Sequence, residues 1–396
     1  MNFDLDMEQM RLRDDVRDFT KRHYGFDDRE MLPDDRAAHE RDNWRLFAVR
    51  GWLATAMPRE YGGGGGTSFE TTLIAHEFGR ALVLEPYLGC AVMAAQTIVA
   101  AGTPQQLARF IPELASGRCR VALAYSEAQS RGMPEPILLR AERAPDGFIL
   151  HGCKTLVLGG VGADRFVVSA VAGEQAVLLM IDAASPGLTI TALELHDGRQ
   201  AAQLAFDGVF APGEALLGEP EKALAALRQG LAHGTAALCA ELVGMMERAI
   251  EITADYLHGR VQFGAPIGRF QALQHRLADM AAEMELSRSM LFALVAALDD
   301  GDREAIQRAV SQTKSLVGRA AKSVCGQAIQ MHGGIGMTEA CPIGHYFKRA
   351  VVADSLLGSS DSHDGVRADA LEHTLKTAEL RWYELLPLWW TARQGA

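Results

Sequence analysis

The sequence predicts an α+β fold made of an N-terminal helical domain, a central antiparallel β domain and a C-terminal bundle of the four-helix type. Three observations predict it: apolar residues first recur at helical spacing, short β-type runs between turn residues follow, and long helical patterns then return. We expect the three domains to comprise residues 1–118, 119–218 and 219–396.

The first domain is expected to be helical because its apolar residues repeat along one helix face. They include Leu12, Val16 and Phe19, and the pattern returns at residues 69–82 and 90–101. Loops such as YGGGGG and LEPY interrupt the pattern, since glycine and proline end regular structure. We therefore expect helices joined by loops.

The second domain is expected to be a sheet because apolar runs of strand length alternate with turns. Turns such as PDG at residues 145–147 and SPG at residues 185–187 separate the runs. The runs are CRVALAYSE, GFILHGCKTLVLGG, DRFVVSAV, AVLLMID, LTITALEL and AAQLAFDGVF. This pattern predicts an antiparallel sheet between helical flanks.

The third domain is expected to contain long helices at residues 231–258, 270–299 and 302–332. In the last of these, apolar or small residues recur at close to the helical period, as at Val317 and Val324. Long helices that pack side by side are typical of an up-and-down bundle.

The composition excludes several classes of protein. Hydrophobic residues make up 48% of the 396 residues, which argues against disorder, and no apolar run is long enough to span a membrane. The net charge of −11 argues against nucleic-acid binding. Six cysteines without a CxxC pair argue against zinc and disulfides, and the charged N-terminus lacks a signal peptide. We expect a cytoplasmic protein without a metal site.

Two glycine-bearing segments lie in the third domain. The first, RVQFGAPIGRFQ at residues 260–271, has too much glycine and proline for a helix and more phenylalanine than a surface loop usually carries. The second, QMHGGIGMT at residues 330–338, follows a long helix. Neither fits a Rossmann fingerprint or a P-loop, because both require a strand, then glycines, then a helix.

These segments form part of an ordered series of motifs. The series is MPREYGG (57–63), AYSE (124–127), HGCKTLV (151–157), LAFDGVFAP (204–212), HGRVQFGAPIGRFQALQHRLADM (258–280) and QMHGGIGMT (330–338). In this order the sequence resembles the acyl-CoA dehydrogenase family over essentially its whole length. The QFG segment and the HGG segment are the most specific of these motifs.

The resemblance implies a tetramer in which FAD lies across a subunit interface. It implies that Arg260 contacts the FAD pyrophosphate. The other residues that it assigns to FAD from the bundle are Gln262, Phe263, Ile267, Phe270, Gln330, Gly333 and Gly334. Three alternatives stay open: core packing for the phenylalanines, a solvated charge for Arg260, and a helix C-cap for the glycines.

In the β domain the resemblance places Tyr125 and Ser126 near the flavin ring. The family often carries an aromatic and a hydroxyl residue against the flavin, where this chain has Leu156 and Leu158. The usual glycine-serine loop after the glutamate is also changed, to AQSRGMPEP at residues 128–136.

The family removes the α-proton of an acyl-CoA with a glutamate, and this chain has none at either of the two family positions. Leu357 occupies one and Gly234 the other. Glu241, two turns beyond Gly234 on the same helix face, is the remaining candidate, and its alternative role is a buried carboxylate paired with a basic residue. Asp361 and Asp364 are weaker candidates, since Asp361 is also suited to a helix cap.

The resemblance implies α,β-dehydrogenation of an acyl-CoA thioester to the enoyl-CoA, with electrons passed to an electron-transfer flavoprotein. Two alternatives stay open. In the first, the chain is a non-catalytic, FAD-supporting subunit of an α2β2 acyl-CoA dehydrogenase for bulky steroid-type thioesters. In the second, it is a flavin monooxygenase or oxidase. Lys348 and Arg349 are candidates for the CoA phosphates or for a solvated face. The acyl group and the choice between homotetramer and heterotetramer stay open.

Overall fold

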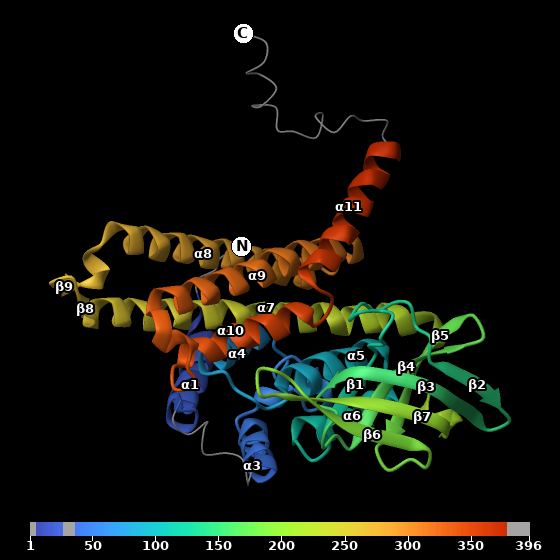
Figure 1. The fold of residues 1–396 in the computed structure, drawn as a ribbon. Coiled ribbons are helices and arrows are strands. Elements are labelled where there is room, and N and C mark those ends of the chain that lie inside the picture. Colours follow the sequence, from blue (N-terminus) through green and yellow to red (C-terminus); the bar gives the residue numbers. More distant parts are fainter. Residues whose placement is uncertain (1–4, 27–35, 378–396) are drawn as a thin grey trace.

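A computed structural model describes residues 5–26 and 36–377, with side chains from residue 39 in the second range and up to residue 376 (Figure 1). The outermost parts of the first and third predicted domains, residues 1–4 and 378–396, lie outside the described residues. Helices, a sheet and a bundle follow one another along the chain, so the predicted fold class is confirmed. The domain boundaries stay predictions.

The N-terminal part consists of short helices, three of which begin at a capping box. In these, Asp6, Thr67 and Thr103 each accept hydrogen bonds from the first turn. The elements are α1 (Met7–His23), α3 (Arg36–Val49), η1 (Trp52–Ala54), η2 (Arg59–Tyr61), α4 (Ser68–Ala81), η3 (Tyr87–Ala94), α5 (Ala95–Ala101) and α6 (Pro104–Ala115).

The central part is a mixed sheet rather than a purely antiparallel one. The strands are β1 (Val121–Ala124), β2 (Arg140–Ala144), β3 (Gly147–Leu158), β4 (Arg165–Ala172), β5 (Gln175–Asp182), β6 (Leu188–Glu194) and β7 (Gln200–Pro212), followed by η4 (Gly213–Ala215). Four strand pairs are antiparallel: β2 with β3, β3 with β7, β4 with β5, and β6 with β7. Strand β4 also pairs parallel with β1 and, at one residue, with β2. These parallel pairs join strands that are distant in sequence, which the short turns did not reveal.

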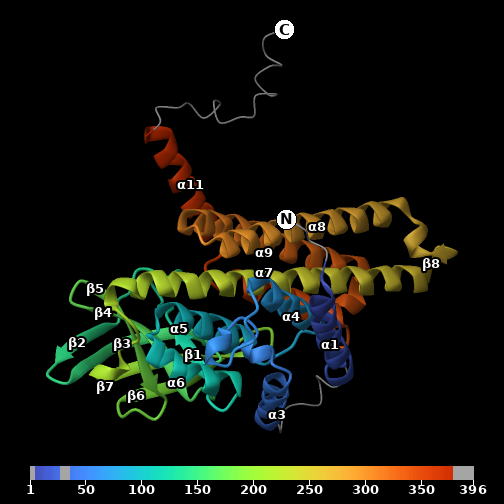
Figure 2. The same ribbon diagram turned by 180° about the vertical axis from the view of Figure 1, so that it is seen from behind.

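The C-terminal part is the predicted bundle, with helices that lie side by side in both views (Figures 1 and 2). The elements are α7 (Pro220–Gly259), β8 (Val261–Gln262), β9 (Ala265–Pro266), η5 (Ile267–Arg269), α8 (Gln271–Asp300), α9 (Arg303–His332), η6 (Gly333–Met337), α10 (Pro342–Ser355) and α11 (Ser360–Thr377). The first helix begins earlier than expected, at Pro220, because proline suits the first turn of a helix. Helix α11 points away from the rest of the molecule (Figure 1).

Helix α7 contacts all three parts of the fold, and α4 crosses it at very short range. A Cβ atom added to Gly79 of α4 would lie 2.0 Å from the Glu241 carbonyl oxygen of α7. In return, a Cβ atom added to Gly244 of α7 would lie 2.1 Å from the His76 carbonyl oxygen. The two glycines therefore allow the backbones of the helices to touch, as the absence of a side chain permits.

We expect Gly79→Ala to lower the free energy of unfolding by about 1–3 kcal/mol or more, because the helices must separate. The measurement is chemical unfolding of the purified protein. Gly365→Ala is the matched control, since a Cβ atom there meets nothing within 4 Å and alanine favours a helix. Equal effects of the two substitutions would show that the crossing tolerates a methyl group.

Candidate active site

The AYSE segment ends β1 in a rigid, buried turn. Tyr125 and Ser126 are both buried; the Tyr125 hydroxyl donates to the Gly132 carbonyl at 3.1 Å, and the Ser126 carbonyl accepts from the Thr155 backbone at 2.9 Å. These bonds tie β1 to the altered loop at residues 128–136 and to β3. Both residues thus lie where β1, β3 and that loop meet, with the Tyr125 hydroxyl bonded inside the protein.

A buried lysine holds the same turn. The Lys154 ammonium donates to Glu127 Oε1 at 2.7 Å, to Ser169 Oγ at 3.0 Å and to the Tyr125 carbonyl at 3.2 Å. Burial lowers the pKa of Lys154 to about 8, and the Glu127 carboxylate opposes that shift. The pair was not predicted, although both residues stand in the motifs AYSE and HGCK.

The QFG segment forms an exposed hairpin at one end of the bundle. Phe263 is 89% exposed and Phe270 41% exposed, and their rings meet edge to face at 6.1 Å. Phe263 has a φ of 55°, a left-handed conformation that turns the chain between β8 and β9. Arg260 and Gln262 are exposed, and Ile267 is half-buried. Core packing therefore does not account for the phenylalanines.

The HGG segment lies at the same end of the bundle. His332 stacks on Tyr256 of α7 at 4.4 Å, which brings the end of α9 close to the start of the hairpin. Gly333 ends α9 with a φ of 68°, so the C-cap role is real. Gln330, Gly333 and Gly334 are exposed, and a Cβ atom added to either glycine meets nothing within 4 Å. The backbone here is open to a ligand.

The two family positions for the catalytic glutamate come together in space. A Cβ atom added to Gly234 would lie 3.7 Å from Leu357 Cδ1 and 2.5 Å from Met93 Cγ. Leu357 is 5% exposed and Met93 is 1% exposed. The place where the resemblance expects a carboxylate is therefore filled by apolar side chains that cannot accept a proton.

The loop that carries Leu357 is nevertheless fixed by buried polar groups. The Lys314 ammonium donates to the carbonyl oxygens of Asp354 at 2.9 Å and Gly358 at 2.8 Å. His363 Nε2 lies 2.8 Å from the Leu357 carbonyl oxygen, so the protonated nitrogen donates to it. Leu357 has a φ of 58°, a conformation that its own side chain does not favour. The surrounding bonds thus hold the loop in one shape.

Glu241 lies in a buried cluster of charges rather than alone. Its Oε1 accepts from Arg199 at 2.7 Å and from Arg349 at 2.8 Å, and its Oε2 accepts from Arg349 at 2.9 Å. Asp197 completes the cluster, with Oδ2 3.0 Å from Arg349. Burial raises the pKa of Glu241, and Arg199 opposes this by favouring the charged form. This is the paired arrangement that the sequence left as the alternative to a base.

The cavity beside this cluster is small. It measures about 60 Å³ and is lined by Glu241, Arg199, Leu158 and Leu356, among others. A cavity of this size has room for only a few water molecules, not for an acyl chain. The side chains of the cluster come from α7, α10 and the β6–β7 turn, and they fill the space between these elements.

The remaining charged candidates lie apart from these segments. Asp361 is exposed and pairs with Arg319 at 3.1 Å, and Asp364 also pairs with Arg319 and accepts from Ser315 at 2.6 Å. Lys348 pairs with Glu339 at 2.6 Å near the surface. The expectation of a solvated face is wrong for Arg349, because its neighbours on α7 and the β6–β7 turn enclose it.

Two family models match the chain: the acyl-CoA dehydrogenase N-terminal domain at residues 6–118 and the acyl-CoA dehydrogenase C-terminal domain at residues 224–371. The chain is also 31% identical over 329 residues to the mitochondrial 2-methylacyl-CoA dehydrogenase of Solanum tuberosum, covering 80% of this chain and 79% of that protein. The chain belongs to the acyl-CoA dehydrogenase family. The predicted family is confirmed.

Further relatives agree with this assignment. The probable acyl-CoA dehydrogenase YngJ of Bacillus subtilis is 29% identical over 354 residues, which cover 85% of this chain and 90% of that protein. Among solved structures, a variant of the Tcur3481-Tcur3483 steroid ACAD has a TM-score of 0.84 and 29% identity over 93% of this chain and 99% of that chain. The ChsE4-ChsE5 complex from Mycobacterium tuberculosis shares the fold, with a TM-score of 0.84 and 24% identity over 94% of this chain and 99% of that chain.

The segments at the end of the bundle fit the FAD that acyl-CoA dehydrogenases are expected to carry. An exposed arginine suits a pyrophosphate, exposed phenylalanines suit an adenosine, and two open glycines permit close approach. Leu156 and Leu158, where the family often carries an aromatic and a hydroxyl residue, are half-buried apolar side chains. Among the described residues no helix is long and apolar enough to cross a membrane, and none of their His, Cys, Asp and Glu side chains group as metal ligands.

Sequence reasoning missed Arg199, Asp197 and Lys314. Arg199 and Asp197 stand in a polar turn, where nothing in the sequence shows which helix the turn will meet. Lys314 could have been found, because it interrupts the small and apolar residues of α9 at a buried position. A lysine at such a position requires buried acceptors.

We expect Arg349→Met to lower the free energy of unfolding by about 3–5 kcal/mol, because Glu241 and Asp197 would remain buried with Arg199 as their one cation in the cluster. The neighbouring substitution Lys348→Met removes a surface pair and should cost about 0–1 kcal/mol. Chemical unfolding measures both. A small effect of Arg349→Met would contradict a structural role for the cluster.

Proposed function

We propose that this chain is a subunit of an FAD-dependent acyl-CoA dehydrogenase in which a second family member supplies the catalytic base. One observation carries the proposal: Leu357, Gly234 and Met93 fill the place of the base with apolar groups. The 29% identity to a steroid ACAD named after two proteins supports a partner chain. The assembly would convert an acyl-CoA thioester of steroid type to the enoyl-CoA and pass electrons to an electron-transfer flavoprotein.

In this proposed function, the residues of the chain bind and position FAD, and they do not transfer protons. Bound FAD would accept the hydride that leaves the β-carbon of the acyl group. Arg260 would neutralise the pyrophosphate, and Phe263 and Phe270 would cover the adenosine. Leu158 and Leu357 would exclude water from the space beside the ring. The exposed apolar tip of the hairpin also favours a neighbouring subunit there.

A second candidate is a self-sufficient dehydrogenase with Glu241 as the base. The observation in its favour is that Glu241 borders the same cavity as Leu158 and Leu356. Against it, both carboxylate oxygens of Glu241 accept hydrogen bonds from arginine. We also propose a cytoplasmic location, because all six cysteines are free thiols.

The first test is a visible absorption spectrum of the chain purified alone and purified with a second acyl-CoA dehydrogenase chain from the same source. A panel of acyl-CoAs, including steroid-type thioesters, is added without oxygen. We expect bleaching of the flavin only with the partner present. Bleaching by the chain alone, abolished by Glu241→Gln, would overturn the proposal in favour of the second candidate.

We expect Leu357→Glu to give a measurable rate with short acyl-CoAs in the chain alone, because Lys314 and His363 already hold the loop. The apolar neighbours would raise the pKa of the new carboxyl toward that of a general base. Leu357→Gln is the matched control and should give no activity. Equal rates for the two variants would exclude a base at this position.

We expect Arg260→Met to lower the flavin content of the purified protein at least several-fold, because a pyrophosphate loses its cation. Arg303→Met, at the opposite end of the bundle, should leave the flavin content unchanged. The ratio of visible to ultraviolet absorbance measures both. An unchanged absorbance ratio for Arg260→Met would show that Arg260 does not bind FAD and is a solvated charge.

A further inference from the structure

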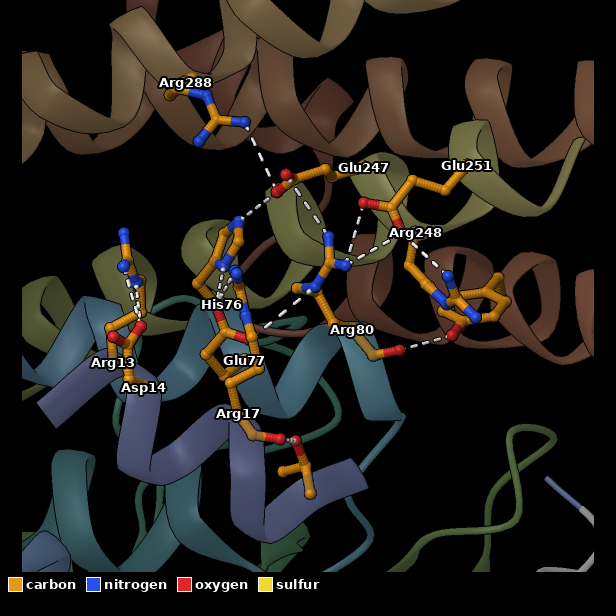
Figure 3. Close-up of polar contacts among 12 residues, drawn as sticks. Arg13, Asp14, Arg17, His76, Glu77, Arg80, Glu247, Arg248, Glu251 and Arg288 are labelled. Carbon is orange, nitrogen blue, oxygen red and sulfur yellow. Dashed lines mark hydrogen bonds and ion pairs between the residues drawn. The ribbon is translucent and has the colours of Figure 1, made fainter. Parts of the chain in front are cut away.

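A network of charged side chains joins the N-terminal helices to the bundle (Figure 3). It lies away from the FAD segments and from the Glu241 cluster, and the proposed function makes no use of it. Its members come from four helices: Arg17 of α1, His76, Glu77 and Arg80 of α4, Glu247, Arg248 and Glu251 of α7, and Arg288 of α8.

His76 stands at the centre of this network between two carboxylates. Its Nδ1 lies 3.3 Å from Glu77 Oε1, and its Nε2 lies 2.8 Å from Glu247 Oε2. The side chain is only 16% exposed. A neutral imidazole carries one proton, so one nitrogen would then present a lone pair to a carboxylate. The closeness of two carboxylates therefore favours the doubly protonated, charged ring.

The two carboxylates stay charged over the whole neutral range. Burial opposes the charge of Glu77, but His76 and Arg17 lower its pKa to about 2. Burial likewise opposes the charge of Glu247, and His76 and Arg80 lower its pKa to about 2. Arginine does not lose its proton in proteins. His76 is thus the member of this network, among the described residues, whose charge changes near neutral pH.

Every helix packed against His76 contributes charge of known sign. Helix α1 brings Arg17, with the pair Arg13 and Asp14 beside it, and α8 brings Arg288 with Glu285. Helix α7 brings Glu247, and also Glu251, which Arg80 and Arg248 hold at 2.9 Å each. From α10, the Tyr346 hydroxyl donates to the Arg80 carbonyl. If His76 lost its second proton, only the arginines would balance the negative charges of Glu77 and Glu247.

We propose that the His76 imidazolium is a pH-sensitive contact between α4 and α7, which strengthens their junction while the ring carries both protons and weakens it when the ring loses one. The close crossing at Gly79 and Gly244 does not depend on this charge. The fold therefore persists at high pH, and only the polar part of the α4–α7 junction, the contact between His76 and Glu247, weakens.

The direction of the pH dependence follows from the neighbours of the ring. Burial lowers the pKa of His76, but Glu247 and Glu77 raise it more, so that it lies above the usual value of 6.5. The stabilisation is then complete below the unfolded value and is lost as the pH rises through the folded pKa. The contribution of His76 to stability should therefore fall as the pH rises above 6.5.

The test compares thermal unfolding of the wild-type protein and the His76→Gln variant between pH 6 and 9, as purified with flavin. We expect the wild-type melting temperature to exceed that of the variant at pH 6 and the gap to shrink by about 2–4 °C or more by pH 9. His151→Gln, at an exposed histidine of β3, should leave the pH profile of the wild type unchanged.

A second measurement keeps the test independent of that variant. Hydrogen exchange of the wild type, corrected for the intrinsic rate, should show faster opening of α4 at pH 8.5 than at pH 6, with α9 unchanged. A gap between wild type and His76→Gln that stays constant from pH 6 to 9, or equal opening of α4 at both pH values, would overturn the proposal. Neither readout requires catalytic activity, so failure here leaves the proposed function untouched.

Discussion

The contact between the backbones of α4 and α7 is the constraint on which the rest of the structure depends. The carbonyl oxygen that Gly79 approaches belongs to Glu241, and the one that Gly244 approaches belongs to His76. The same crossing thus fixes the main chain of both buried charge networks. On one side the Glu241 cluster ties α7 to the β6–β7 turn and α10. On the other side the His76 network ties α7 to α8 and α4 to α1. Two glycines suffice because any larger residue would separate the helices.

Buried polar contacts hold both the Glu241 cluster and the Leu357 loop in place, and neither depends on a carboxylate at position 357. Buried ions are stable only when each meets a partner of opposite charge, and here two guanidinium groups meet two carboxylates. The Leu357 loop keeps its unusual backbone through bonds to carbonyl oxygens, which do not depend on the side chain at that position. The loop therefore keeps its shape without a carboxylate at position 357.

Local patterns in the sequence predicted the helices of the bundle, because each long helix repeats its apolar residues at its own period. The family motifs assigned Arg260 to Phe270 to FAD, which stays a proposal, and the hairpin that carries Arg260, Gln262, Phe263 and Phe270 is exposed. Pairings between distant residues were beyond reach. Nothing local tells that β1 runs parallel to β4, or that Arg199 in a turn will meet Glu241. The choice between a base and a paired carboxylate depended on that meeting.

The hairpin tip has a consequence for how the protein exists in solution. Phe263 is 89% exposed and Val261 is 54% exposed, so an isolated chain presents a hydrophobic surface to solvent at this tip. Any neighbour that covers this surface binds the folded form and not the unfolded one, and so adds to its stability by mass action. Dilution would then act as a denaturant, and the melting temperature of this protein would depend on its concentration.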